Sequence, residues 1–304
     1  MTRQAHDQLA KQYLAELLTA LGQVETSLDV SSEVRQVDIW FVPISSSSTD
    51  VKNLGLLNLI AKNSCVIEVF RNAPTAVEVR NCQLKLYAKH GEMLRTARKE
   101  KTTLTEPDLP FLWILSPTCS ANFLDSFGAK SKNESNFPEG VYFLPDSQKT
   151  AIVAINQLPE NLDTLYVRVL GRGGTQKRAI EELVALPNRD VLLNNLLEIL
   201  ASWRTNLQLK NNLSNEEQEE IMNLSPAYEK QREEWKLEGK EEGNLLGQRL
   251  LVTSLIQGRF GTLDEELYAI IKTIMELPIG DRTQLLLNLS NLSREELLSR
   301  LGGN

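Results

Sequence analysis

The apolar pattern of this chain changes at about residue 163. Before that point, short runs rich in β-branched and aromatic residues predict strands at 24–30, 34–42, 65–70, 111–115, 141–144 and 151–155. Helical periodicity predicts helices at 7–21, 53–61 and 75–93, and Ser31-Ser32 is the predicted turn of a hairpin between the first two strands. The order helix, strand, strand, strand, helix, strand predicts an α/β domain built around one sheet.

After residue 163, strand signals disappear and helical patterns follow one another. Helices are predicted at 163–186, 190–210, 216–247, 248–259, 264–276, 282–290 and 294–301. Capping boxes predict helix starts at Thr75, Ser214, Thr262 and Ser293, because each is followed three residues later by a glutamate. We therefore expect three parts: an α/β domain over 1–170, a helical extension with a charged linker helix over 171–245, and a small helical domain over 246–304.

Composition excludes several classes of function. The chain has 304 residues and a net charge of −7, with two histidines and three scattered cysteines. Two histidines cannot build a zinc site with several imidazoles, and three cysteines do not form a disulfide framework. The nearest approach to a phosphate-binding P-loop, Gly171-Arg-Gly-Gly-Thr175, lacks the lysine and is predicted to end a helix. An enzyme of this composition must work with carboxylates, lysines or a metal held by oxygen.

Hydrophobic runs in the sequence are short. None approaches the ~20 apolar residues that a membrane-spanning helix needs, and the first residues, MTRQAHDQLAKQYLAELL, lack the apolar core of a signal peptide. We expect no membrane partner and a cytoplasmic location.

Two carboxylates fall on neighbouring predicted strands. Asp38 lies on the second strand, and Glu68 interrupts the otherwise apolar run Cys65-Val-Ile-Glu-Val-Phe70 on the third. Adjacent strands lie ~4.8 Å apart, so facing carboxylates can share a divalent cation such as Mg²⁺. The alternative is purely structural: Asp38 pairs with Arg35 or Arg71, and Glu68 is held by backbone or by an arginine.

The order of elements and these two carboxylates resemble the PD-(D/E)XK nuclease superfamily. Its core has an Asp on the second strand, a (D/E)xK motif on the third and, in one branch, a QxxxY motif on the following helix, which Gln83-Leu-Lys-Leu-Tyr87 matches here. The whole chain is similar to bacterial recombination-promoting nucleases and transposase-related proteins that carry a helical C-terminal domain of unknown function. The resemblance implies Mg²⁺-dependent cleavage of DNA, with Asp38 and Glu68 as metal ligands and Gln83 and Tyr87 as helpers.

One position departs from the family pattern. Phe70 stands two residues after Glu68, where the motif requires a lysine. Lys85 and Arg80 on the following helix are the candidates to supply the missing cation. The rival hypothesis is a catalytically inactive DNA-binding or scaffold protein that keeps the fold and associates through its helices, in which Gln83 and Tyr87 are packing residues.

Basic residues concentrate around the predicted third strand and the helix that follows it. Residues 61–105 hold nine bases and four acids, including the cluster Arg95-Thr-Ala-Arg-Lys-Glu-Lys101. This charge indicates phosphate contact, and we expect the cluster to lie beside the Asp38 and Glu68 site. A solvated helix end with favourable dipole interactions is the alternative.

Three glycines recur inside a charged helix. Gly239, Gly243 and Gly247 are spaced by four, and each costs a helix ~1 kcal/mol. Their shared face predicts close approach of a partner backbone and hence a homodimer, whereas a frayed linker helix is the alternative.

Overall fold

The fold comes from a computed structural model, which describes residues 2–29, 36–44, 53–131, 136–187 and 190–301. The chain separates into two compact units, Met1–Gln231 and Arg232–Asn304. The predicted turn at Ser31-Ser32 lies outside the described residues.

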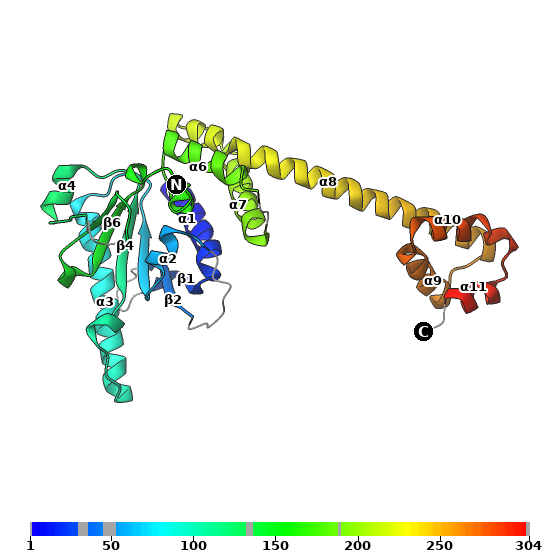
Figure 1. The fold of residues 1–304 in the computed structure, drawn as a ribbon, viewed down its shortest axis with the longest axis horizontal. Coiled ribbons are helices and arrows are strands. Elements are labelled where there is room, and N and C mark those ends of the chain that lie inside the picture. Colours follow the sequence, from blue (N-terminus) through cyan, green and yellow to red (C-terminus); the bar gives the residue numbers. More distant parts are fainter. Residues whose placement is uncertain (1, 30–35, 45–52, 132–135, 188–189, 302–304) are drawn as a thin grey trace. The chain divides into compact units, whose positions relative to one another are not determined.

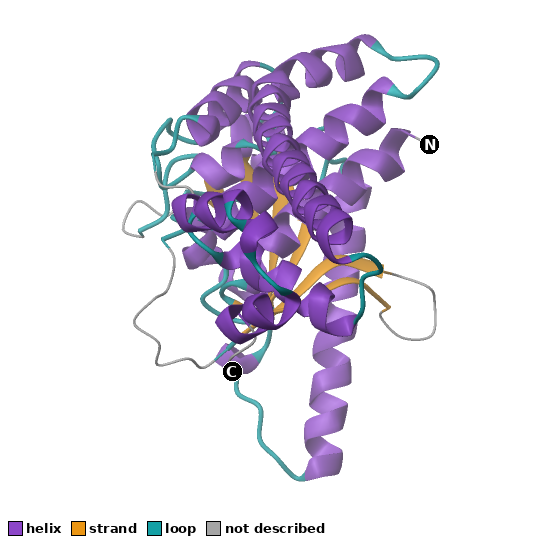
Figure 2. Cartoon of the chain, turned by 90° about the vertical axis from the view of Figure 1, so that its right-hand side faces the viewer, coloured by secondary structure: helices purple, strands orange, loops and turns teal. Residues whose placement is uncertain are grey.

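The first unit is built on one six-stranded mixed sheet (Figure 1). Its strands are β1 (Gly22–Asp29), β2 (Gln36–Pro43), β3 (Cys65–Val69), β4 (Phe111–Ser116), β5 (Val141–Phe143) and β6 (Thr150–Ala154). Their order across the sheet is β1-β2-β3-β4-β6-β5, and all strands of the described residues belong to it (Figure 2). The first three strands are antiparallel, whereas β3, β4 and β6 are parallel and β5 is antiparallel to β6.

Helices cover both faces of this sheet (Figure 1). On one face, α3 (Ala76–Glu100) packs over a core that includes Val66, Ile114 and Ile152, and it forms the crossover from β3 to parallel β4. The other face is covered by α1 (Thr2–Thr19), α2 (Leu56–Ile60), α5 (Leu165–Arg168), α6 (Gly174–Val184) and α7 (Val191–Gln208). The central strands are buried on both faces, which explains their nearly continuous apolar runs.

The start of α3 follows from its capping box. The Thr75 hydroxyl accepts from the Glu78 amide at 3.3 Å, and the Glu78 carboxylate accepts from the Thr75 amide at 2.9 Å. This confirms the predicted start, but the helix continues to Glu100 rather than ending near residue 93.

Several predicted helix boundaries were wrong. The expected helix over 163–186 is broken into α5 and α6, because Gly173 adopts φ of 59°, a left-handed conformation that glycine tolerates best. The expected pair over 216–259 is one helix, α8 (Asn215–Phe260). Thr262 does not cap α9 (Glu265–Glu276): Asp264 does, since its carboxylate accepts from the Leu267 amide.

The second unit is entirely helical among its described residues. It contains the end of α8, then α9, α10 (Ile279–Leu287), a 3-10 turn at Leu289–Asn291 and α11 (Arg294–Leu301). Its core joins Val252 and Ile256 of α8 to Leu267, Ile271 and Ile274 of α9. An α/β sheet followed by a helical C-terminal region is thus confirmed. The compact division falls at Gln231, and the buried faces of α6 and α7 belong to the core of the sheet.

Among the described residues, no helix is both long and apolar enough to span a membrane.

Arg168 is fully buried and connects α5 to α6. Its guanidinium donates to both Glu182 carboxylate oxygens, at 3.0 and 2.6 Å, and to the Asn161 carbonyl at 2.9 Å.

Arg168→Met should lower the free energy of unfolding by about 2 to 3 kcal/mol, because it leaves these acceptors without their donor. Urea denaturation measures the change. Arg178→Met, which breaks a half-exposed pair with Glu160, is the control and should cost under about 1 kcal/mol. Equal losses in the two variants would contradict this account.

Candidate functional site

Asp38 and Glu68 lie where the pairing of β2 with β3 ends. The antiparallel register runs through Trp40↔Val66 and Ile39↔Ile67, and the next position sets Asp38 against Glu68. At this end of the pairing, the Val69 amide of β3 donates to a side chain and not to a backbone carbonyl of β2: its acceptor is Asp38 Oδ2, at 3.1 Å. The two strands are adjacent, as the sequence predicts.

Glu68 is a carboxylate within an apolar layer. Residues on either side of it along β3, Ile67 and Val69, belong to the core on the other face, whereas Val66 shares its face beneath α3. Only 4% of the residue is exposed. An ionised carboxylate in such surroundings needs a cationic partner or several hydrogen bonds.

Lys85 of α3 provides that partner. Its Nζ lies 2.9 Å from Oε1 and 2.8 Å from Oε2 of Glu68, so a single ammonium group bridges both carboxylate oxygens. The Lys85 side chain is itself only 18% exposed. The helix therefore delivers a lysine to the third strand from outside that strand.

The pKa values of this pair reflect burial and charge together. Burial raises the pKa of Glu68 to about 7, and the negative charge of Asp38 adds to the rise, whereas the Lys85 ammonium and the Asp38 backbone amide oppose it. Burial is the largest single influence on the pKa of Lys85 and lowers it, but the charge of Glu68, the hydrogen bond to Glu68 and the neighbouring Cys82 and Asp38 together raise that pKa above its ordinary value. Near neutral pH, Lys85 is charged and Glu68 is close to its titration midpoint.

Asp38 has a second lysine partner that the sequence analysis missed. Lys11 of α1 places its Nζ 3.0 Å from Asp38 Oδ1, and both side chains are 16% exposed. Nothing local marks Lys11 in the sequence, because it is one polar residue of an amphipathic helix and reaches Asp38 only through the tertiary fold. Of the arginine partners considered for Asp38, Arg71 pairs with Glu220 instead. Arg35 lies outside the described residues.

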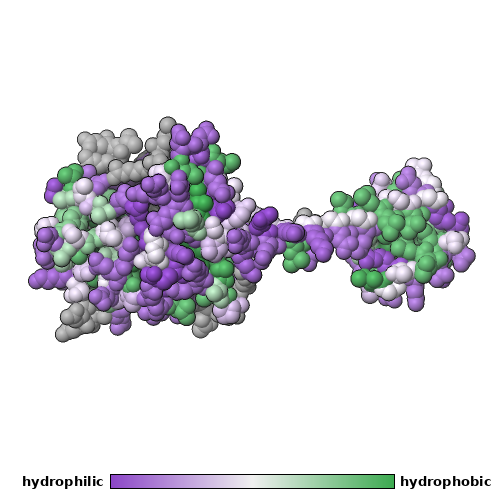
Figure 3. Space-filling model, turned by 90° about the horizontal axis from the view of Figure 1, so that it is seen from above, coloured by the Kyte–Doolittle hydropathy of each residue, from purple (hydrophilic) through white to green (hydrophobic). Residues whose placement is uncertain are grey.

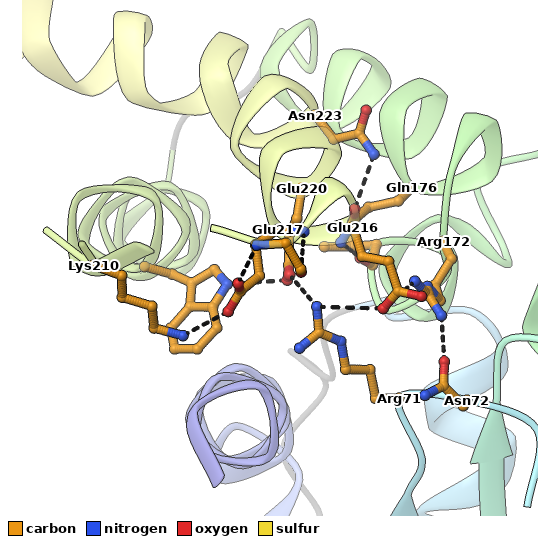
Figure 4. Close-up of polar contacts among 12 residues, drawn as sticks. Arg71, Asn72, Arg172, Gln176, Lys210, Glu216, Glu217, Glu220 and Asn223 are labelled. Atoms are coloured by element: carbon orange, nitrogen blue, oxygen red, sulfur yellow. Dashed lines mark hydrogen bonds and ion pairs between the residues drawn. The ribbon is translucent and has the colours of Figure 1, made fainter. Parts of the chain in front are cut away.

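Arg71 belongs to a separate polar cluster (Figure 4). Its guanidinium lies 3.5 Å from Glu220 of α8, whose carboxylate also accepts from the Trp203 indole at 3.0 Å. Arg172 pairs with Glu216 at 3.0 Å in the same cluster. Burial raises the pKa of Glu220, which Trp203 and Arg71 counteract. These contacts attach the start of α8 to the sheet domain and leave Asp38 and Glu68 to the lysines.

The other predicted helper residues face a different part of the sheet domain. Gln83 is buried, and its amide donates to Gln148 Oε1 at 2.9 Å, while the exposed Tyr87 hydroxyl lies 3.4 Å from the Gln148 carbonyl. Arg80 is exposed on α3. Of the two cationic residues predicted to substitute for the motif lysine, Lys85 is the one that forms an ion pair with Glu68.

Phe70 occupies the position of the motif lysine. It is half-buried and packs against the core beneath α3, with its backbone amide donating to the Leu115 carbonyl at 2.8 Å. The residue after β3 is therefore aromatic at the position where the sequence resemblance predicts a lysine.

The basic cluster at 95–101 lies farther away than expected. Arg95, Arg98, Lys99 and Lys101 are exposed at the end of α3, which extends past the sheet (Figure 1). At 1.5 Å per residue, Arg95 is about 15 Å along the helix axis from Lys85. A nucleic acid must span several nucleotides to meet both.

The donor set at this site agrees with Mg²⁺ in kind. Magnesium in proteins commonly takes one or two carboxylates together with water and substrate phosphate. Asp38 and Glu68 supply two carboxylates, but all four of their oxygens already accept from Lys11, Lys85 or the Val69 amide. In the part of the chain that the structure describes, no group of three or more His, Cys, Asp or Glu side chains is placed to hold a metal. A cation at these two carboxylates must therefore displace an ammonium group.

Comparisons with protein-family models, curated proteins and solved structures return no significant match for this chain.

The raised pKa of Glu68 makes folding stability depend on pH. The folded chain retains a proton up to about pH 7 that the unfolded chain releases near its ordinary value of 4.5. The free energy of unfolding should therefore fall as pH rises from 4.5 to 7, by about 3 kcal/mol from this group. Glu68→Gln should remove that component, as measured by urea denaturation at pH 5 and 7.5.

Glu92→Gln serves as the control for this measurement, because Glu92 is a half-exposed carboxylate on α3 that pairs with Lys89. It should keep the difference between the two pH values seen in the wild type. An unchanged pH difference in Glu68→Gln would show that Glu68 titrates at its ordinary value.

Proposed function

We propose that this chain is a metal-dependent phosphodiesterase of the PD-(D/E)XK type that acts on DNA. Asp38 and Glu68 are the proposed Mg²⁺ ligands, and Lys85 takes the role of the motif lysine. The partners proposed for the chain are DNA and, through the helix with Gly239, Gly243 and Gly247, a second copy of itself.

The observation that carries the proposal is the position of Lys85. Its ammonium bridges both oxygens of Glu68, at 2.8 and 2.9 Å. Catalysis needs the positive charge at that place and not a particular backbone origin, so a lysine from α3 is chemically equivalent. The sheet domain begins with α1, β1 and β2, and after the short helix α2 it continues with β3, α3 and β4. Apart from the insertion of α2, this order agrees with the order of elements in that family.

Each residue then has a definite task. A bound divalent cation supplies polarisation of the phosphate and activation of water. Asp38 and Glu68 fix its position, Lys11 limits the negative charge around Asp38, and Lys85 stabilises charge that develops on the phosphate oxygens. Because protonated Glu68 cannot bind a cation, occupancy should increase as pH rises through about 7.

DNA binding is proposed from the exposed bases of α3. Arg95, Arg98, Lys99 and Lys101 lie in one segment with little acidic charge, and such a segment attracts phosphates in a salt-dependent way. Its distance of about 15 Å from Lys85 corresponds to roughly four nucleotides at 3.4 Å per nucleotide.

An inactive scaffold is the second candidate function. It is favoured by the saturation of the site, because Lys11 and Lys85 already neutralise Asp38 and Glu68 in the described geometry. Buried pairs of this kind also occur as structural elements without any catalytic role.

Cleavage of plasmid DNA with Mg²⁺ or Mn²⁺ tests the catalytic proposal. We expect weak cleavage by the wild type and a rate lower by about 10² to 10³ in Lys85→Ala, as for loss of a comparable electrostatic donor. Adding Phe70→Lys to that variant should recover part of the rate. Lys89→Ala is the matched control, since Lys89 is a similarly buried lysine one turn further along α3 that contacts Glu92 and Trp40.

The change in melting temperature on adding Mg²⁺ provides a readout that is independent of turnover. The increase in melting temperature should be larger at pH 8 than at pH 6, and it should be lost in the double variant Asp38→Asn, Glu68→Gln. Absence of both the shift and cleavage in the wild type would establish the scaffold alternative. Cleavage at the wild-type rate by the double variant would refute both assignments.

A further inference from the structure

One face of α8 carries both exposed large apolar side chains and small residues, mainly glycine. Trp235 is 40% exposed, and Leu246 and Leu250 are each 59% exposed. They share a helical face with Gly239, Gly243 and Ser254, because the spacings between the six positions are four, four, three, four and four. These six residues are called the α8 stripe below.

The glycines of the α8 stripe face open space. Among the described residues, a Cβ added at Gly239 or Gly243 would meet no atom within 4 Å beyond its chain neighbours and the backbone of its own helix. Glycine inside a helix costs about 1 kcal/mol relative to alanine. Within the described part of the chain, no close approach of another segment at Gly239 or Gly243 offsets that cost.

The 232–304 unit, which contains the whole α8 stripe, has its own core on a different face of α8. Val252 and Ile256 enter that core, whereas Leu246 and Leu250 remain exposed. Hydrophobic residues also gather on the surface of the 232–304 unit in the view of Figure 3. An exposed apolar face of this kind indicates an interaction surface.

The sizes along the α8 stripe are self-complementary when one copy is reversed. From Trp235 to Ser254 they read large, small, small, large, large, small. About a two-fold axis between residues 244 and 245, Trp235 faces Ser254, Gly239 faces Leu250, and Gly243 faces Leu246 of the other copy. Each large side chain then meets a small one, six times in the pair.

We propose that two copies of the chain associate through the α8 stripe as antiparallel helices related by that two-fold axis. The surface is the same on both copies, as a closed isologous dimer requires. Each leucine packs onto the bare backbone of a glycine in the partner, which permits a close approach of the two helices. This inference rests on the self-association proposed above and specifies how the two copies meet, but it does not depend on the catalytic proposal.

A parallel pair with the same stripe would be poorly packed. It places Gly239 and Gly243 opposite their own copies and leaves gaps there, while Leu246 and Leu250 meet large partners. Empty space in an interface forfeits dispersion contacts, so the reversed arrangement is the one that fills both kinds of position.

Charge also favours the reversed arrangement. The segment 238–242 carries three glutamates and one lysine, whereas Arg249 follows on the other side of the two-fold axis. Reversal brings the Arg249 segment of one copy alongside 238–242 of the other, twice in the dimer. A parallel pair sets the acidic segment against itself, which is unfavourable.

Cross-linking of a mixed dimer tests the orientation. Gly239→Cys and Leu250→Cys variants are coexpressed with different tags and oxidised mildly. We expect a disulfide-linked species of twice the 34.2 kDa chain mass that contains both tags. Either variant expressed alone should stay unlinked, because residue 239 of one copy is eleven residues, or about 16 Å, from residue 239 of the other. A disulfide requires the two Cα atoms to lie within about 7 Å.

The native thiols provide no competing reaction, since Cys65, Cys82 and Cys119 are buried. Wild-type chain treated in the same way is the control and should remain unlinked. If each variant instead formed disulfide-linked dimers with itself and no mixed species appeared, the helices would be parallel and the antiparallel arrangement would be wrong. A monomeric wild type at micromolar concentration in sedimentation would reject the pairing altogether.

A size exchange within the stripe tests the packing itself. Gly243→Leu should weaken the dimer at least tenfold by sedimentation equilibrium while the sheet domain stays folded, because leucine then meets Leu246 of the partner. The double variant Gly243→Leu, Leu246→Gly should return the dissociation constant to within about threefold of wild type, since it restores one large and one small residue at each contact. Leu245→Gly is the control, because Leu245 is equally exposed at 59% but lies off the stripe, and it should leave association unchanged. Failure of the double variant to recover, or an equal loss in the control, would overturn the proposed contacts.

Discussion

A carboxylate buried in the middle of a sheet face constrains how the first unit is assembled. All five residues of β3 are buried, and Glu68 is the one carboxylate among them. Its charge is tolerable only with a cation close by, so α3 must lie across the sheet with Lys85 directly above β3. The same helix forms the crossover to β4, and the position of the ion pair and the parallel pairing of the two strands therefore depend on each other.

The sheet was predictable because its signals are local. Five-residue apolar runs such as 65–69 identify buried strands without reference to the rest of the chain, and the box at Thr75 fixes a helix start within four residues. Boundaries failed where tertiary contacts or backbone conformation decide them. The break at Gly173 depends on a left-handed φ, and Asp264 competes successfully with Thr262 for the same helix end.

Part of the candidate site could be predicted from the sequence. Asp38 and Glu68 could be paired because strand alternation and neighbouring order follow from pattern, and Lys85 could be nominated because it lies on the next helix. Lys11 could not, since it reaches Asp38 from α1 across a separation in sequence that no local rule bridges. Gln148, the partner of Gln83, was missed for the same reason.

The catalytic and the structural hypotheses differ in what they require of the charges at this site, where two lysines neutralise two carboxylates. A site of net charge near zero is stable without a metal, whereas a site that binds Mg²⁺ tightly needs uncompensated negative charge. Both requirements are met if Lys85 neutralises Glu68 in the free protein and turns to the phosphate when a divalent cation takes its place. Because burial raises the pKa of Glu68, the protonated fraction must lose its proton before a cation can take the place of Lys85, so this exchange should become easier as pH rises. Lys85, which offsets part of the cost of burying the Glu68 carboxylate in the free protein, would then supply the positive charge that the proposed chemistry uses.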